Sequence, residues 1–165
     1  MQEAVILNDQ QIRDKIKRMA FQILESCTET EKIILAGIAD GGYSLAKLIT
    51  VELNQISDIE VLLCEVLIDK KNPKTPIKTN LKPQAYEHQF VVLVDDVLNS
   101  GTTLIYGVRH FLEVEVRQFK TAVLVDRSHK KYPVKADFKG ISLSTSIQET
   151  VEVNLSQAPF TALLK

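Results

Sequence analysis

Two adjacent carboxylates, Asp95 and Asp96, directly follow the apolar run 91–94. That run has the composition of a strand buried on both faces, and open parallel sheets bind ligands at the carboxyl ends of their strands. Paired carboxylates in that place can accept hydrogen bonds from vicinal sugar hydroxyls or act through a divalent cation. The pair therefore predicts a site for a hydroxylated ligand, a metal ion, or both.

A short polar loop follows the carboxylates and leads into a helical pattern. Its residues are Asn99, Ser100, Gly101, Thr102 and Thr103. Backbone N–H groups at a helix start and small hydroxyl side chains can surround an anion, and glycine permits close approach of the backbone. A monophosphate fits such a loop, so loop and carboxylates together imply a sugar phosphate. The alternative is that the acids merely end a strand and that Ser100 or Thr102 merely caps a helix.

The hydrophobic pattern predicts the elements that would position these residues. Short apolar runs predict strands at 33–38, 61–68, 90–94 and 121–125. Spacings of three and four predict helices at about 10–26, capped by Asn8 or Asp9, after the turn at 40–42, and after the polar loop. Strands alternating with helices imply an α/β fold, with a parallel sheet between helices, and we predict one domain over 1–165.

Two regions are less regular. Residues 69–89 hold five lysines and three prolines, which predicts a loop or a frayed hairpin. The tail after Tyr132 has short β-like pieces at 141–144 and 151–155, which predict an edge strand or a small cap.

Composition excludes several classes of protein. Twenty Lys and Arg against 21 Asp and Glu give a net charge of −1, which excludes a uniformly basic nucleic-acid coat but not a local basic patch. The lysines within 70–82, together with Arg127 and the lysines within 130–139, could bind RNA phosphates or form a solvated charged face. Only two cysteines occur, so neither a disulfide framework nor a zinc site is indicated. We predict a cytoplasmic protein without a membrane span or an export signal.

Residues 91–103 resemble the phosphoribosyl-diphosphate (PRPP) signature of type I phosphoribosyltransferases. The resemblance implies a central parallel sheet flanked by helices, with a mobile hood in the flexible loop at about 65–89. It implies that Asp95 and Asp96 are the catalytic acids, hold the ribose hydroxyls, and bind Mg²⁺ directly or indirectly. It also implies that the polar loop 99–103 wraps the 5-phosphate of PRPP.

Residues 37–47 are similar to the pyrophosphate loop of the same family and to the helix after it. The loop itself is Ala39, Asp40, Gly41 and Gly42. The resemblance implies a cis peptide near Ala39–Asp40 that aims backbone N–H groups at pyrophosphate. Asp40 and Gly41 depart from the family, because close relatives carry a basic residue here. A carboxylate beside pyrophosphate is repulsive unless magnesium intervenes or Asp40 turns outward.

The segments 122–129, 133–140 and 144–146 resemble the C-terminal half of the PyrR family, regulators of pyrimidine operons that are also uracil phosphoribosyltransferases. By resemblance, Arg127 and Phe138 are base-side residues, and a homodimer or higher homo-oligomer is expected. His129, beside Arg127, is interpreted as structural or solvent-facing. Purine-specific relatives have an acid–base aspartate where Asn99 stands, which disfavours a purine substrate here.

The favoured hypothesis is a phosphoribosyltransferase that joins a nucleobase, with uracil preferred, to PRPP and releases pyrophosphate. The alternative is a nucleotide-sensing, RNA-binding regulator of pyrimidine genes with little or no transferase activity. RNA as a partner is not supported by the net charge of −1, and Ile147 stands where the PyrR pattern has a basic residue. The hood departs as well, because its expected Arg-Asp pair is absent.

Overall fold

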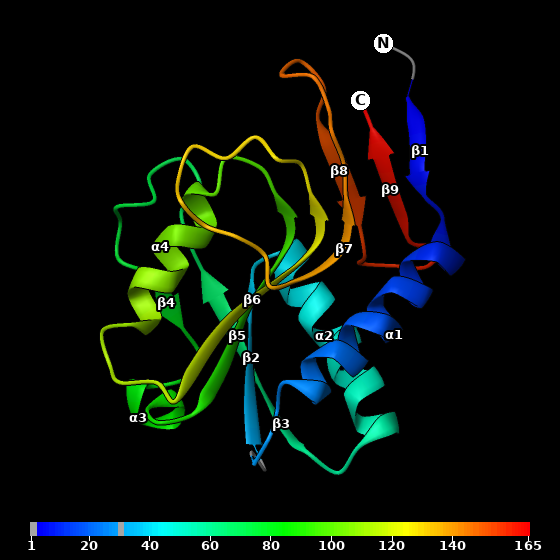
Figure 1. The fold of residues 1–165 in the computed structure, drawn as a ribbon. Helices are drawn as coiled ribbons and strands as arrows, with labels where there is room; N and C mark the ends of the chain where they lie inside the picture. Colours follow the sequence, from blue (N-terminus) through cyan, green and yellow to red (C-terminus); the bar gives the residue numbers. More distant parts are fainter. Residues whose placement is uncertain (1–2, 30–31) are drawn as a thin grey trace.

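The computed structural model describes residues 3–29 and 32–165 of the chain. Its elements alternate between strands and helices through most of the sequence (Figure 1). They are β1 (Ala4–Leu7), α1 (Asp9–Glu25), β2 (Lys32–Ile38), α2 (Gly41–Ile56), β3 (Glu60–Leu67), β4 (Lys78–Thr79), α3 (Pro83–Tyr86), β5 (Phe90–Leu98), α4 (Thr102–Phe111), β6 (Gln118–Asp126), β7 (Phe138–Ser142), β8 (Val151–Asn154) and β9 (Thr161–Leu164). The predicted α/β class is confirmed.

The larger sheet has six strands in the order β4-β3-β2-β5-β6-β7. All neighbouring pairs are parallel except β3 and β4. The chain runs from β2 outward to β3, and then returns to the other side of β2 with β5. The strand order therefore reverses between β2 and β5, and a crevice opens beside the carboxyl ends of strands at such a point.

Helices cover both faces of this sheet (Figure 1). On one face, α1 and α2 pack over a core that includes Ile12, Ile49 and Val92, each fully buried. On the other face, α4 and the short α3 enclose a second core around Phe111 and Leu93. Each aliphatic side chain removed from water contributes roughly 1.5–3 kcal/mol. The two cores therefore hold the carboxyl ends of the central strands in fixed positions.

Helix α1 shows how local sequence sets an element boundary. Asn8 Oδ1 accepts a hydrogen bond from the Gln11 backbone N–H at 2.9 Å, and Gln11 Oε1 accepts one from the Asn8 backbone N–H at 2.9 Å. This reciprocal capping box satisfies two N–H groups that the helix itself leaves unpaired. Of the two caps predicted from the sequence, the structure uses Asn8.

A second, antiparallel sheet joins the two ends of the described chain, in the order β1-β9-β8. The pieces expected in the tail appear as β7, which is an edge strand of the large sheet, and β8. Strands β1 and β9 are not anticipated by the sequence pattern. Each has four residues, too few for a periodicity to show, and they pair across the length of the chain, with Ala4 opposite Leu164.

The lysine-rich region 69–89 is partly ordered into elements. Residues Lys78–Thr79 form β4 and pair antiparallel with Val66 and Leu67 at the end of β3, so the hairpin interpretation is confirmed. Helix α3 follows at Pro83, in the helix position that suits proline. We call residues 65–89 the hood loop. Within the part of the chain that the structure describes, none of the helices has the length and apolar character needed to cross a membrane.

Candidate active site

The pyrophosphate-like loop and the acid pair come together at the reversal point of the sheet. They follow β2 and lie at the end of β5, two strands that are parallel neighbours. Gly41 lies directly against Asp96, since a Cβ placed on Gly41 would stand 2.1 Å from Asp96 Oδ2. Gly42 lies equally close to the β5 backbone, since its Cβ would stand 2.4 Å from the Val94 carbonyl oxygen. Glycine at 42 therefore lets the loop backbone approach β5, and glycine at 41 leaves room for the Asp96 carboxylate.

The two carboxyl groups lie in different environments. Asp95 is 5% exposed, and its Oδ1 accepts the Asp96 backbone N–H at 3.0 Å. Asp96 is partly exposed, and its Oδ1 accepts the Val97 backbone N–H at 2.8 Å. Burial raises the pKa of Asp95 well above its usual value, and the Asp96 charge raises it further, while Lys70 of the hood loop opposes both effects. Asp95 is thus a buried acid that would be stabilised as a carboxylate by a cation or by hydroxyl donors.

The raised pKa of Asp95 makes a prediction about stability. A carboxyl whose pKa is higher in the folded state than in the unfolded state destabilises the fold as pH rises through the interval between these two values. Asp95→Asn keeps the acceptor for the Asp96 N–H and removes this cost. We expect the ligand-free variant to melt about 2–8 °C above the unmodified protein at pH 8, with a smaller gain at pH 4.5.

Thermal unfolding followed by circular dichroism across this pH range checks the expectation. Asp58→Asn, at an exposed position outside the helices and strands, serves as the control. A melting temperature of the Asp95 variant that follows the control at every pH would contradict the assignment of Asp95 as a costly buried acid.

The segment between β2 and α2 has the backbone form that the family resemblance implies. The peptide bond between Ala39 and Asp40 is cis, which confirms that expectation. Asp40 caps α2 through its carbonyl, which accepts the Ser44 N–H at 3.1 Å, while its exposed side chain makes no capping hydrogen bond. The first N–H groups of α2, from Gly41 onward, have no intrahelical acceptor and are available to an anion.

The polar loop after β5 forms a small cavity at the start of α4. Ser100 Oγ lies 2.8 Å from Thr102 Oγ1 and accepts the Thr102 N–H at 3.3 Å. Gly101 has φ +82°, a left-handed conformation that strains any residue with a side chain. The cavity is about 50 Å³ and includes Asp95 and Thr103 in its wall, besides the loop residues Asn99, Ser100, Gly101 and Thr102. Its size and N–H donors suit a single phosphate group.

A segment from the end of β6 covers this phosphate-type loop. Its backbone N–H groups donate to the loop carbonyls, from Arg127 to Leu98 at 3.0 Å and from Lys131 to Ser100 at 2.7 Å. Val134 packs so close to Gly101 that a Cβ on the glycine would stand 2.5 Å from its Cγ2. The loop is therefore held from both sides, by α4 and by residues 127–134.

Arg127 is the centre of a hydrogen-bond network beside the loop. Arg127 is 4% exposed, and its guanidinium donates to Asn99 Oδ1 at 3.1 Å and to Thr145 Oγ1 at 2.9 and 3.0 Å. It also donates to the carbonyls of Ser146 and Glu149. Among the described residues, no acid forms an ion pair with it. A buried cation without a counterion favours an anionic ligand nearby.

A larger cavity of about 590 Å³ opens next to this network. Its walls are Asn99, Arg127, Ser128, His129, Lys130, Ile147, Glu149 and Thr150. Asn99 borders both this cavity and the small one, so the two are adjacent. We call the larger one the base-side cavity. His129 and Thr145 belong to this region, although no functional role is predicted for them from the sequence. Hydrogen bonds from Arg127 and His129 bring residues 145–149 to the end of β6.

Phe138 lies elsewhere. It is 7% exposed, sits at the start of β7 opposite Ala122, and packs in the core on the α1 side of the sheet. The structure therefore does not bring Phe138 together with Arg127 around one cavity. The neighbouring buried acid Asp126 accepts the Ser128 N–H at 3.1 Å and pairs with Lys130 and Lys139, which fixes the turn after β6.

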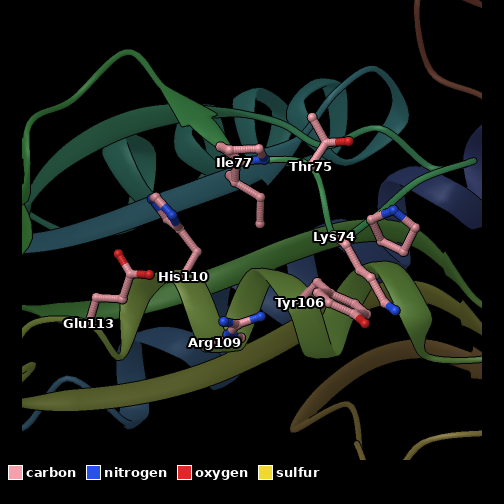
Figure 2. A pocket seen from close by; sticks show the side chains of 9 residues that line it. Lys74, Thr75, Ile77, Tyr106, Arg109, His110 and Glu113 are labelled. Atoms are coloured by element: carbon pink, nitrogen blue, oxygen red, sulfur yellow. The ribbon is translucent and has the colours of Figure 1, made fainter.

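A further cavity of about 220 Å³ separates the hood loop from α4 (Figure 2). Its labelled residues are Lys74, Thr75 and Ile77 from the hood loop and Tyr106, Arg109, His110 and Glu113 from α4 and its C-terminal end. None of the residues predicted for the site borders it. His110 Nε2 is buried there without a hydrogen-bond partner among the described residues, and burial lowers the pKa of this imidazole.

The sheet, the acid pair at its reversal point and the two anion-type loops define a phosphoribosyltransferase of type I. The chain belongs to this family, since the phosphoribosyl transferase domain matches residues 4–157. Within the family it is related to PyrR. It is 32% identical over 168 residues to the bifunctional protein PyrR of Bacillus cereus and, equally, to that of Bacillus anthracis, covering 95% of this chain and 93% of each relative.

Solved structures share the fold at lower identity. A hypoxanthine-guanine phosphoribosyltransferase of Bacillus anthracis superposes with a TM-score of 0.77 at 18% identity, covering 98% of both chains. A hypoxanthine phosphoribosyltransferase of Trypanosoma cruzi superposes with a TM-score of 0.78 at 16% identity, covering 98% of this chain and 95% of the other. At this identity the likeness establishes the fold.

Proposed function

We propose that this chain transfers the ribose 5-phosphate group of PRPP to a nucleobase, with uracil favoured, and releases pyrophosphate. The observation that carries the proposal is the convergence of three features at one edge of the sheet. The acid pair, the N–H groups at the start of α2 and the phosphate-type loop at the start of α4 lie together, and the base-side cavity adjoins them through Asn99.

Each feature has a role in this reaction. The loop 99–103 holds the 5-phosphate by N–H groups and hydroxyls. Asp95 and Asp96 accept hydrogen bonds from the ribose hydroxyls and stabilise positive charge that develops on the ribosyl group. The loop 39–42 holds the pyrophosphate as it leaves. Catalysis of this kind depends on positioning and charge stabilisation more than on a nucleophile.

The acids also fit a magnesium ion that is bound mainly through the substrate. The described part of the chain contains no group of three or more His, Cys, Asp or Glu residues arranged to hold a metal. Mg²⁺ commonly uses one or two carboxylates, substrate phosphates and water. Asp95 and Asp96 would hold it, and it would neutralise charge on the pyrophosphate. Asp40 is exposed, so its carboxylate can turn outward and avoid repelling the pyrophosphate.

Two observations favour uracil as the base. The chain is 32% identical to PyrR proteins, whose family the sequence motifs also resemble, whereas the hypoxanthine-guanine and hypoxanthine enzymes described above are 18% and 16% identical to it. Asn99 Oδ1 is held by Arg127, and an amide cannot exchange the proton that purine-specific relatives exchange through an aspartate. The same proposal includes a single domain over residues 1–165, a cytoplasmic location and assembly into at least a homodimer.

A nucleotide-sensing RNA-binding regulator is the second candidate. Its support is the similarity to a bifunctional PyrR and the exposure of the lysines at 130, 131, 135 and 139, which phosphates of RNA could contact. The 90% exposed Ile147 offers no charge at the place where the PyrR pattern has a cation.

Calorimetric titration with PRPP and Mg²⁺, followed by pyrophosphate release on addition of uracil, hypoxanthine, guanine or xanthine, separates the candidates. We expect PRPP to bind and pyrophosphate to be released with uracil. Position 99 of the base-side cavity is an asparagine, which cannot exchange a proton with a purine as an aspartate would. Release with a purine alone would contradict the proposed base. Binding without release for any of the four bases would favour the regulator, and absence of binding would contradict the site itself.

A further inference from the structure

We propose that His129 is the general base of the transfer and takes the proton from the nucleobase ring nitrogen that bonds to the ribose. This inference rests on the proposed transferase function. The reacting nitrogen of uracil carries a hydrogen that has to leave when the glycosidic bond forms. A basic side chain at the base-side cavity would accept it, and His129 is in the wall of that cavity.

The other groups around the cavity are poorly suited to accept a proton. The amide of Asn99 is not basic. The guanidinium of Arg127 has only N–H donors, which donate to Thr145, Asn99 and Ser146. Lys130 is an ammonium paired with Asp126 at 3.7 Å. Glu149 accepts the Ser146 N–H at 2.6 Å, and hydrogen bonds from Ser146 hold the pKa of its carboxyl below the usual value. Ser128 and Thr150 have only hydroxyls, and Ile147 is apolar. His129 is therefore the remaining residue in the cavity wall that can accept a proton.

The hydrogen bonds of His129 fix which ring nitrogen is the base. Its Nε2 lies 2.6 Å from the Thr145 carbonyl oxygen, which can only accept, so Nε2 carries the hydrogen. In the neutral ring the lone pair is then on Nδ1. Thr145 is itself held by the buried Arg127, so the carbonyl that orients the imidazole is anchored. A base oriented by a third group is the arrangement found in many catalytic sites.

The backbone before His129 points to the same role. Ser128 has φ +62°, a left-handed conformation that is uncommon for residues other than glycine. It is fixed there because its N–H donates to Asp126 Oδ1 and because Arg127, the residue before it, is hydrogen-bonded to Leu98. This turn places the imidazole at the cavity, next to Asn99 and the phosphate-type loop.

The proposed step is balanced without any further reactant. The lone pair of the uracil nitrogen forms the bond to C1 of the ribosyl group, and the C1–O bond to pyrophosphate breaks with its electron pair on the leaving oxygen. The N–H proton moves to His129 Nδ1, and the imidazolium then loses it to solvent. The network around Arg127 thus positions a proton acceptor in the wall of the base-side cavity.

His129→Gln tests the assignment, because the glutamine amide can still donate to the Thr145 carbonyl but has no basic nitrogen. We expect kcat with uracil to fall about 10²-fold, with PRPP affinity by calorimetry unchanged. With 5-fluorouracil, whose ring N–H is more acidic, we expect a loss of only about 10-fold, because less help is needed to remove the proton. His88→Gln, at an exposed histidine just before β5 on the opposite edge of the sheet, is the matched control.

The outcomes separate this inference from the proposed function. Equal losses for the two bases, or no loss in His129→Gln, would overturn the general-base role while the transferase stands. If instead Glu149→Gln lowers kcat more with uracil than with 5-fluorouracil, the general base is Glu149 and the assignment of His129 is overturned. An unmodified protein that binds PRPP but turns over neither uracil nor 5-fluorouracil would overturn the proposed transfer to uracil and, with it, this step.

Discussion

Replacing Asp95 and Asp96 together by asparagine is expected to lower pyrophosphate release from PRPP by at least about 10³-fold. Both acids lie toward the carboxyl end of β5, where the Asp96 side chain and the Asp95 backbone are against the loop 39–42, and in the proposed reaction they stabilise the positive charge of the ribosyl group. Asparagine keeps the acceptors for the Asp96 and Val97 N–H groups, so the local backbone is preserved. PRPP binding should be lost with turnover, because the carboxylates and the cation that they would attract are both removed.

The same double variant should leave any affinity for RNA unchanged. The exposed lysines beyond β6 that could contact RNA phosphates keep their charge, and no cation is removed from the surface. Turnover, PRPP titration and RNA binding at one salt concentration form the measurement, with Asp58→Asn as the control. Full transferase activity in the double variant would show that the acid pair is not the site.

The second large effect concerns the glycines that bring the pyrophosphate-type loop against β5. In Gly42→Ala the new Cβ would stand 2.4 Å from the Val94 carbonyl oxygen and 2.8 Å from Asp95 Cα. Both atoms belong to the backbone of a central strand, so α2 and β5 would have to separate. Overpacking of this kind costs about 1–3 kcal/mol, which lowers the melting temperature by about 2–12 °C. Transferase activity should fall as well, since the loop would move away from the acids.

Gly41→Ala provides the comparison within the same loop. Its Cβ would meet the Asp96 side chain, which can rotate away, whereas Gly42 faces only backbone. We therefore expect the melting temperature of Gly41→Ala to stay within about 2 °C of the unmodified protein, and its turnover to fall because the Asp96 carboxylate is displaced. Calorimetric melting and pyrophosphate release measure both effects. Two variants with the same melting temperature would contradict the backbone contact described for Gly42.

The sequence predicted those parts of the site that are contiguous in the chain. Residues 91–103 run from a buried strand through two acids to a helix start, and each feature shows in the order of residue types alone. The structure places the acid pair and the loop where a parallel sheet has to place them. The alternation of apolar runs and helical spacings likewise predicted the α/β class and the central strands.

Features that depend on contacts between distant segments could not be predicted in this way. His129 gains its orientation from Thr145, and Arg127 is tied to both Asn99 and residues 145–149, so the base-side cavity exists only after the tail has folded back on β6. Phe138, assigned to the base side by resemblance, lies in the core on the α1 side, because the pleat of β7 directs alternate residues to opposite faces. No local pattern distinguishes these outcomes.

The pairing of β1 with β9 has a consequence for how the protein is made. Ala4 pairs with Leu164, and Arg18 of α1 donates to the carbonyl of Gly140 at 2.6 Å, so β1 and α1 complete their packing only against elements that are translated much later. Until β7 and β9 are translated, β1 presents unpaired backbone groups to solvent and α1 lacks its contact with β7. Contacts of such long sequence separation slow folding. The segment that holds β1 and α1 therefore depends on protection during translation until these later strands are available.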